Sequence, residues 1–296
     1  MNRPAQAGQA GQRCALNLAG AKVDKDSIDR GDWLVTPELH EPTSKLDVEL
    51  RIAPRAGRAL RHWTPVHVHL GAARLMGRVA VLEGDALGPG ETGLVQLVLD
   101  TPTVALRGDR VILRDQSARD TLGGGRVLDN APPTRGRRST ERLAILRALG
   151  RDDPAAALVE LLDLVPGGVD LARFARLWNL DDATLGQLRA LPALVEVPGP
   201  AGAIAFAPQR WESLKARTLA GVAKRKLSEG AHAEALARVR EAFDLWPSTE
   251  GLSAVLDALE AEAARKPAAD AKPAHEKAEK KPEPEPPREE KPAEGD

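Results

Sequence analysis

Cysteine, tyrosine and long apolar runs are the scarcest features of this 296-residue chain. Its single cysteine, Cys14, excludes an internal disulfide framework and fits a reducing compartment. Aromatic residues make up only 3% of the sequence, so a surface that works mainly by stacking on bases is not expected. No apolar run approaches the roughly 18 residues needed to cross a bilayer, and residues 1–12 lack the apolar core of a signal peptide. We therefore predict a cytoplasmic protein without a membrane partner.

Motifs for nucleotide binding and catalysis are also absent. The sequence has no G-x-x-x-x-G-K-[ST] phosphate loop, no G-x-G-x-x-G that opens a helix and no H-E-x-x-H motif. Residues 123–125 are three glycines among predicted strands, where a hairpin or a bulge at a barrel rim explains them better than a phosphate site. We predict a chain that is not an enzyme, holds no cofactor or metal, and binds no guanine nucleotide.

Residues 45–133 are predicted to form a series of short strands. Val66, Val68 and Leu70 alternate with His67 and His69, the period-2 pattern of a strand with one buried face. Evenly spaced short strands separated by Gly, Pro and Asp are typical of a small antiparallel β-barrel. The strands that we predict here are residues 47–52, 66–70, 77–82, 93–100, 104–106 and 110–114.

After Pro132 and Pro133 the apolar period changes from 2 to 3.6, which indicates a second domain of helices. Short helices followed by a hairpin (residues 194–197 and 204–206) are the order of a winged-helix domain, here residues 134–207. The mixed β and α fold is thus a barrel followed by a winged helix. The helices are predicted at residues 139–149, 155–164, 171–178 and 183–191, capped by Ser139 or Thr140, by Asp153, by Asp170, and by Asp181 or Asp182.

The remaining segments flank these two domains. Residues 1–12 form a flexible lead, and residues 13–40 hold two strands (13–19 and 33–35), too few for a domain. They are predicted to be the remnant of another barrel. Residues 208–264 are predicted to be helical, and residues 265–296, rich in Lys, Glu, Pro and Ala, are predicted to be disordered.

The net charge of −1 means that any contact with nucleic acid must come from a local patch. One such patch is PRAGRALRHW, where a solvated hairpin connection and an RNA-backbone contact are equal alternatives for Arg55, Arg58, Arg61 and His62. His67 and His69 share a strand face, but without further ligands a structural role is favoured over a metal pair. The predicted recognition helix of the winged domain offers only Arg189 as a cation, which favours a structural or protein-contact role.

Several motifs resemble SelB, the bacterial selenocysteine-specific translation elongation factor family. AGQRCALNLAG (residues 10–20) and IDRGDWL (28–34) are similar to the closing strands of its domain II. HVHLGAARLMGRV (67–79), VLDTP (98–102) and GDRVILRDQSARDTLGGGRV (108–127) resemble its domain III, and NAPPTRGRR (130–138) its exit linker. The similarity continues through GVDLARFA (168–175) and APQRW (207–211) of its first winged helix.

The resemblance implies a translation-factor type of barrel and a protein that delivers selenocysteinyl-tRNA to the ribosome at recoded UGA codons. Arg13 ends the A-G-Q-R motif and takes the position of the family's arginine that senses the selenocysteinyl group. The basic loop would contact the tRNA acceptor arm. GTP and magnesium would be used by a domain missing here, so a truncated start at Met1 is expected. Contact with the mRNA hairpin is doubtful because later winged helices are not recognisable.

A second hypothesis from another class is a non-catalytic adaptor that uses its barrel, winged helix and helical segment for protein contacts. An upstream reading frame encoding a GTPase would favour the elongation factor, whereas a genuine promoter and start site before Met1 would favour the adaptor.

Overall fold

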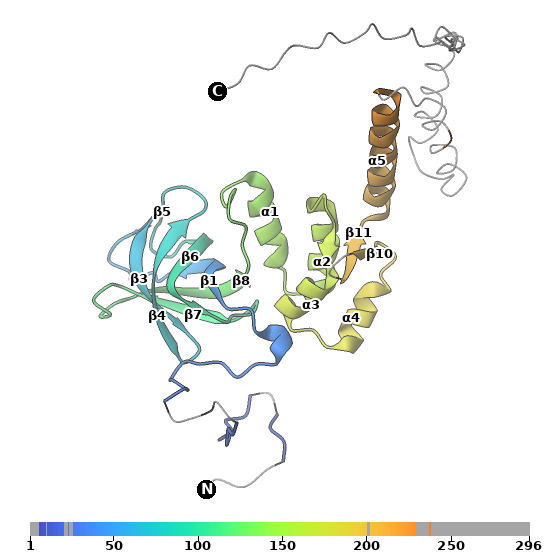
Figure 1. Ribbon diagram of the computed structural model, residues 1–296. Coiled ribbons are helices and arrows are strands. Elements are labelled where there is room, and N and C mark those ends of the chain that lie inside the picture. Colours follow the sequence, from blue (N-terminus) through green and yellow to red (C-terminus); the bar gives the residue numbers. More distant parts are fainter. Residues whose placement is uncertain are drawn as a thin grey trace, which may run out of the picture. The chain divides into compact units, whose positions relative to one another are not determined.

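The computed structural model describes residues 6–9, 11–20, 23, 26–199, 202–228 and 237. The chain divides into two compact units, residues 1–214 and 215–296. The first unit contains a β-barrel and a small domain of helices with a β-sheet (Figure 1). No helix in the described ranges has an apolar stretch of the length that a bilayer requires.

The barrel is closed and antiparallel, with the strand order β1-β6-β4-β3-β7-β8. Its strands alternate between inward apolar and outward polar residues, and the inward residues include Val48, Val68 and Val111. The predicted barrel is therefore confirmed. The strands are β1 (Thr43–Ile52), β3 (Thr64–Leu70), β4 (Ala73–Val81), β6 (Thr92–Thr103), β7 (Arg110–Arg114) and β8 (Thr121–Asp129), with a separate pair β2 (Leu60–Arg61) and β5 (Ala86–Leu87).

One strand predicted within the barrel is wrong. Residues 104–106 form no strand, because the Leu106 N–H donates to the Asp109 carboxylate at 2.9 Å and closes a turn instead. The three glycines lie inside β8, and the register shift between Leu113 and Arg114 beside Gly123 agrees with the bulge rather than the hairpin of the two predicted alternatives. A Cβ on Gly125 would stand 2.1 Å from the carbonyl oxygen of Glu49, so β1 and β8 approach too closely for a side chain there.

The segment before the barrel also differs from the prediction. Residues 13–19 and 33–35 form no strand, and the regular structure here is a short 3₁₀ helix, η1 (Pro37–Leu39). Two strands without a neighbouring sheet cannot hold their own ladder, which explains the difference. Trp33 packs on the barrel, since a Cβ on Gly71 would lie 3.1 Å from its ring.

The second domain has the predicted order of helices followed by a hairpin. Ser139, Asp153, Asp170 and Asp181 cap the four helices by accepting hydrogen bonds from backbone N–H groups, as predicted. The hairpin pairs with one further short strand in a sheet of order β10-β11-β9. The elements are α1 (Thr140–Leu149), α2 (Pro154–Leu164), β9 (Val169–Asp170), α3 (Leu171–Trp178), α4 (Asp182–Arg189), β10 (Val195–Gly199) and β11 (Gly202–Phe206).

A buried ion cluster joins the barrel to the winged helix. Its buried members are Asp47, Gln96, Asp129 and Arg142, and the exposed Arg173 reaches Asp129 from the side of α3. Arg142 on α1 places Nη2 2.5 Å from an oxygen of Asp47 and 2.7 Å from one of Asp129. Arg173 on α3 reaches Asp129 at 2.9 Å, and Gln96 donates to Asp47 at 2.9 Å. Apolar residues of both domains, including Leu82, Leu128 and Leu146, surround this junction in one core. The two domains are thus held together by both apolar packing and paired charge.

Helix α5 (Pro208–Ser228) follows the winged helix and agrees with the start of the predicted helical segment. Apart from residue 237, the rest of the helical prediction up to residue 264 lies outside the described residues. The predicted disordered tail of residues 265–296 lies outside them as well, as do residues 1–5 and 10 of the predicted flexible lead.

Candidate RNA-binding surface

The basic loop is PRAGRALRHW without its final Trp63 and with Ala53 in front (residues 53–62). It connects β1 to β3 and is anchored at both ends. At its start the Ala53 N–H donates to the Leu122 carbonyl of β8 at 2.9 Å. At its end Leu60 is buried, and β2 pairs with β5. A loop fixed in this way presents its side chains with little loss of conformational entropy on binding. Its exposed cations are Arg55, Arg58 and Arg61.

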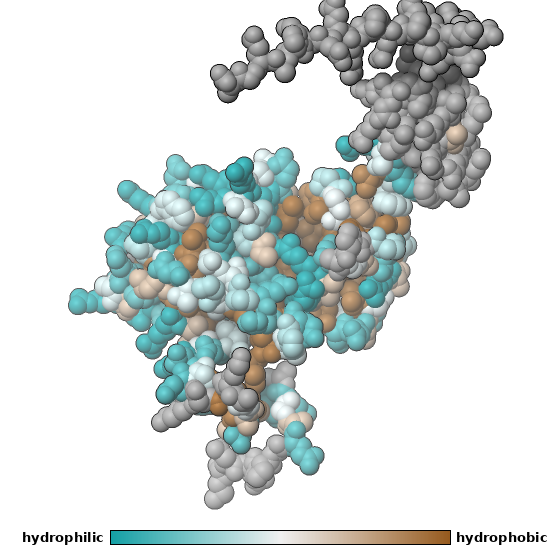
Figure 2. Space-filling model, viewed as in Figure 1, coloured by the Kyte–Doolittle hydropathy of each residue, from teal (hydrophilic) through white to brown (hydrophobic). Residues whose placement is uncertain are grey.

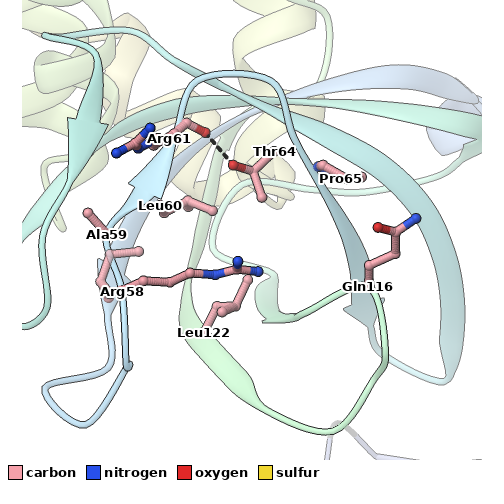
Figure 3. Close-up of a pocket in the computed structure, with 9 residues that line it drawn as sticks. Arg58, Ala59, Leu60, Arg61, Thr64, Pro65, Gln116 and Leu122 are labelled. Atoms are coloured by element: carbon pink, nitrogen blue, oxygen red, sulfur yellow. Dashed lines mark hydrogen bonds between the residues drawn. The ribbon is translucent and has the colours of Figure 1, made fainter.

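The first hollow lies between the basic loop and residue Gln116, with a volume of about 590 Å³. In Figure 3 the Arg58 side chain extends across it above Leu122. The Arg61 guanidinium points away from the centre, while its carbonyl accepts a hydrogen bond from the Thr64 hydroxyl at 2.7 Å. No carboxylate lines this hollow, so its polar groups suit an anion.

A second hollow of about 600 Å³ shares Arg58 and Leu122 with the first. Arg55 also lines it, but so do Asp115 and Asp120. These carboxylates oppose the approach of a phosphate, because like charges repel. The first hollow therefore suits an anion better than the second does.

The Asp115 carboxylate organises the turn that faces the basic loop, and the hydrogen bonds that it accepts there favour its charged form. It accepts from the Ser117 hydroxyl and from the N–H groups of Arg119 and Asp120, both at 2.8 Å. The hydrogen bond from the Ser117 side chain and those from the backbone lower the pKa of Asp115 to about 2. The turn therefore carries a fixed anion at neutral pH.

His62 differs from the three arginines of the basic loop. It is half-buried, and its ring Nδ1 lies 3.3 Å from the Val81 carbonyl oxygen. Its backbone N–H donates a hydrogen bond to the Asp85 carbonyl at 3.0 Å. Its ring therefore helps to fix the end of the loop. The structure brings the predicted arginines to one surface and turns the predicted histidine toward the backbone.

The outer face of β3, β4 and β7 carries Arg74 and Arg114, which add positive charge to the barrel, and two histidines. His67 and His69 project from it, as the period-2 pattern predicted, and His67 Nε2 lies 3.2 Å from the Gln116 carbonyl oxygen. Partial burial, with smaller contributions from Arg74 and Arg114, lowers the pKa of His69. These three strands contain no Asp or Glu. In Figure 2 hydrophilic residues cover most of the barrel face in view.

Arg13 lies exposed in the segment before the barrel, which forms no strand. Among the hydrogen bonds and ion pairs of the described residues, none joins it to the basic loop. In the described part of the chain, Arg13, the predicted amino-acid sensor, is thus not bonded to the basic loop, which holds the predicted RNA-backbone contacts.

The winged helix offers few uncommitted cations near its predicted recognition helix. Arg189 on α4 pairs with Glu196 at 3.3 Å, and Arg176 on α3 pairs with Glu41 at 3.1 Å. Arg173 pairs with Asp129 of the buried ion cluster. Arginines paired in this way are poorly placed to neutralise phosphates, which agrees with a structural or protein-contact role for this domain.

The match with known proteins covers the barrel that carries this surface. Residues 46–134 match the family model for the β-barrel domain of the selenocysteine-specific elongation factor. The selenocysteine-specific elongation factor of Escherichia coli strain K12 is 38% identical over 195 residues, which cover 66% of this chain and 30% of that protein. The one from Haemophilus influenzae is 34% identical over 160 residues, or 54% and 25% of the two chains.

A third relative, the selenocysteine-specific elongation factor of Desulfomicrobium baculatum, is 31% identical over 182 residues, 61% of this chain and 28% of that protein. The chain thus spans less than a third of the length of each of these relatives. These matches confirm the resemblance that the sequence motifs indicated.

Proposed function

We propose that this chain supplies the barrel and winged-helix part of a SelB-type elongation factor, which delivers selenocysteinyl-tRNA to the ribosome at recoded UGA codons. The observation that carries the proposal is the match of residues 46–134 to the β-barrel domain of such factors. The closed barrel and its exposed arginines support it, because they give a rigid surface for an RNA backbone.

In this proposal the basic loop holds phosphates of the tRNA. Arg58 spans the first hollow, and a guanidinium can donate two parallel hydrogen bonds to a phosphate. Arg55 and Arg61 flank it on the same loop and add attraction that depends on ionic strength. Such contacts fix the position of the tRNA and carry no sequence information of their own.

Arg13 is proposed to recognise the selenocysteinyl group. A selenol is more acidic than a thiol and is anionic at neutral pH, and a guanidinium offers several donors to an anion in a fixed geometry. The exposure of Arg13 supports access to an aminoacyl end. The GTP and magnesium of the family are proposed to act outside these 296 residues, because the sequence lacks a phosphate loop.

The basic loop is tested by replacing Arg55, Arg58 and Arg61 together with Ala. We expect at least about tenfold weaker binding of labelled tRNA at low salt, because charge-assisted contacts contribute about 1.5–3 kcal/mol each. The slope of log affinity against log salt should fall by about two to three. Fluorescence anisotropy titrations at several salt concentrations measure both quantities.

A matched control removes the same charge elsewhere, by replacing the exposed Arg151, Arg189 and Arg217 with Ala. This control should keep nearly all of its tRNA affinity. Equal losses in the two triple variants would show that the loop contributes only net charge, and full affinity in the loop variant would reject the proposed contact.

A further inference from the structure

Trp63 directly follows the basic loop and differs from the other described tryptophans in its surroundings. Trp33 packs beside Gly71, Trp178 lies under the Arg107 guanidinium at 3.5 Å, and Trp211 contacts the Phe206 ring. Trp63 stands in a turn with 42% of its surface exposed, about as much as Trp33 at 41%, and the Arg137 guanidinium lies over its ring.

The backbone holds Trp63 in this position. Its φ of +64° lies in the left-handed region, which is unfavourable for a bulky residue. Its N–H donates to the Val79 carbonyl of β4 at 2.7 Å, and the Thr64 hydroxyl bonds to the Arg61 carbonyl at 2.7 Å. These bonds on both sides of the residue fix the turn, so the ring is presented by a rigid support.

One guanidinium lies over the exposed ring. The Arg137 Cζ is 5.2 Å from its centre, the tilted His62 ring lies 5.4 Å away, and Arg61 is two positions earlier in the chain. A carboxylate in this neighbourhood, Asp85, is paired with Arg138 at 3.8 Å. The local charge therefore favours an anionic ligand next to an aromatic face.

We infer that Trp63 is a stacking platform for an unpaired nucleobase of RNA, with Arg137 and Arg61 placed for the adjoining phosphates. Stacking on an aromatic ring requires a free base face, which single strands offer and the interior of a duplex does not. The combination of a rigid exposed indole and neighbouring guanidiniums is the one that single-strand binding proteins use. The inference rests on the proposed RNA binding but adds a preference that phosphate contacts alone cannot give.

The test compares a labelled ten-nucleotide single-stranded RNA with its duplex, using the whole chain. Trp63→Ala should weaken binding of the single strand about five- to 150-fold, while duplex binding stays within about twofold of the wild type. Trp63→Phe, which keeps an aromatic face, should retain most of the affinity. Trp33→Ala is the matched control, since Trp33 is exposed to 41% and lines a hollow that includes no residue of the basic loop.

The two hypotheses fail in different ways. If the triple arginine variant loses both RNAs and Trp63→Ala binds the single strand normally, the basic loop is supported and the stacking platform is rejected. Equal losses of single strand and duplex in Trp63→Ala, or the same loss in Trp33→Ala, would also reject it. A wild-type chain that binds neither RNA would overturn both proposals. Thermal melting verifies that each variant is folded.

Discussion

Replacing Gly125 with Ala is expected to destabilise the barrel by about 3 kcal/mol or more. The added Cβ would stand 2.1 Å from the Glu49 carbonyl oxygen and 3.0 Å from the Leu50 Cα. Both are backbone atoms of β1, which is hydrogen-bonded to β8 along this stretch, so neither can turn aside as a side chain would. The pair of strands must separate, and the closed barrel depends on that pair.

Gly124 is the matched control for this change. It is the next residue in β8, but a Cβ there would meet only the Val111 carbonyl oxygen, at 3.2 Å. Gly124→Ala should therefore change the free energy of unfolding by no more than about 1 kcal/mol. Urea unfolding followed by circular dichroism measures both variants. Similar stabilities for the two would contradict the close approach of β1 and β8.

Replacing Arg142 with Met is expected to cost about 3–5 kcal/mol of stability. Asp47 is fully buried and Asp129 almost so, and both would lose the guanidinium between them. Burial already raises the pKa of Asp47 despite Arg142. For Asp129, burial also acts upward, but Arg142 and Arg173 outweigh it and lower its pKa. Without Arg142, Gln96 is the one hydrogen-bond partner left to the Asp47 carboxylate among the residues that the structure describes.

The cost of this substitution should depend on pH in a defined direction. In the variant the pKa of Asp47 in the folded state lies above its unfolded value, so the folded state takes up a proton more readily. The loss should be largest at neutral pH and should shrink as the pH falls through the raised folded-state pKa. Arg147 lies on the same helix as Arg142 and makes an exposed ion pair with Glu83, which precedes the helix. Arg147→Met should therefore cost less than about 1 kcal/mol of stability. A small or pH-independent loss for Arg142→Met would show that the cluster does not bind the domains together.

Local patterns predicted the regular elements well. Strand β3 follows from the alternation of Val66, Val68 and Leu70, and the helices begin where Ser139 and Asp153 can cap them. The strands predicted at residues 13–19 and 33–35 failed because periodicity cannot tell whether a partner strand exists. Local patterns also allowed a bulge at the three glycines, but they could not indicate the close approach of β1 to β8, which is a long-range property.

The candidate site was predictable only in part. The clustering of arginines in the basic loop can be seen in the sequence, but Gln116 joins the first hollow only because the barrel closes. The buried ion cluster joins Asp47 to Arg142 across 95 residues, and no local pattern indicates that pairing. Trp63 gave no signal because its positive φ and its proximity to Arg137 depend on the folded turn.

The proposed function is tested most directly by comparing the binding of selenocysteinyl-tRNA with that of seryl-tRNA. Both should bind weakly, and the wild-type chain should prefer the first by about 10- to 100-fold if Arg13 makes one charge-assisted contact. Arg13→Ala should remove this preference and leave affinity for seryl-tRNA unchanged. Equal binding of the two tRNAs by the wild-type chain, or a preference that persists in Arg13→Ala, would contradict the account.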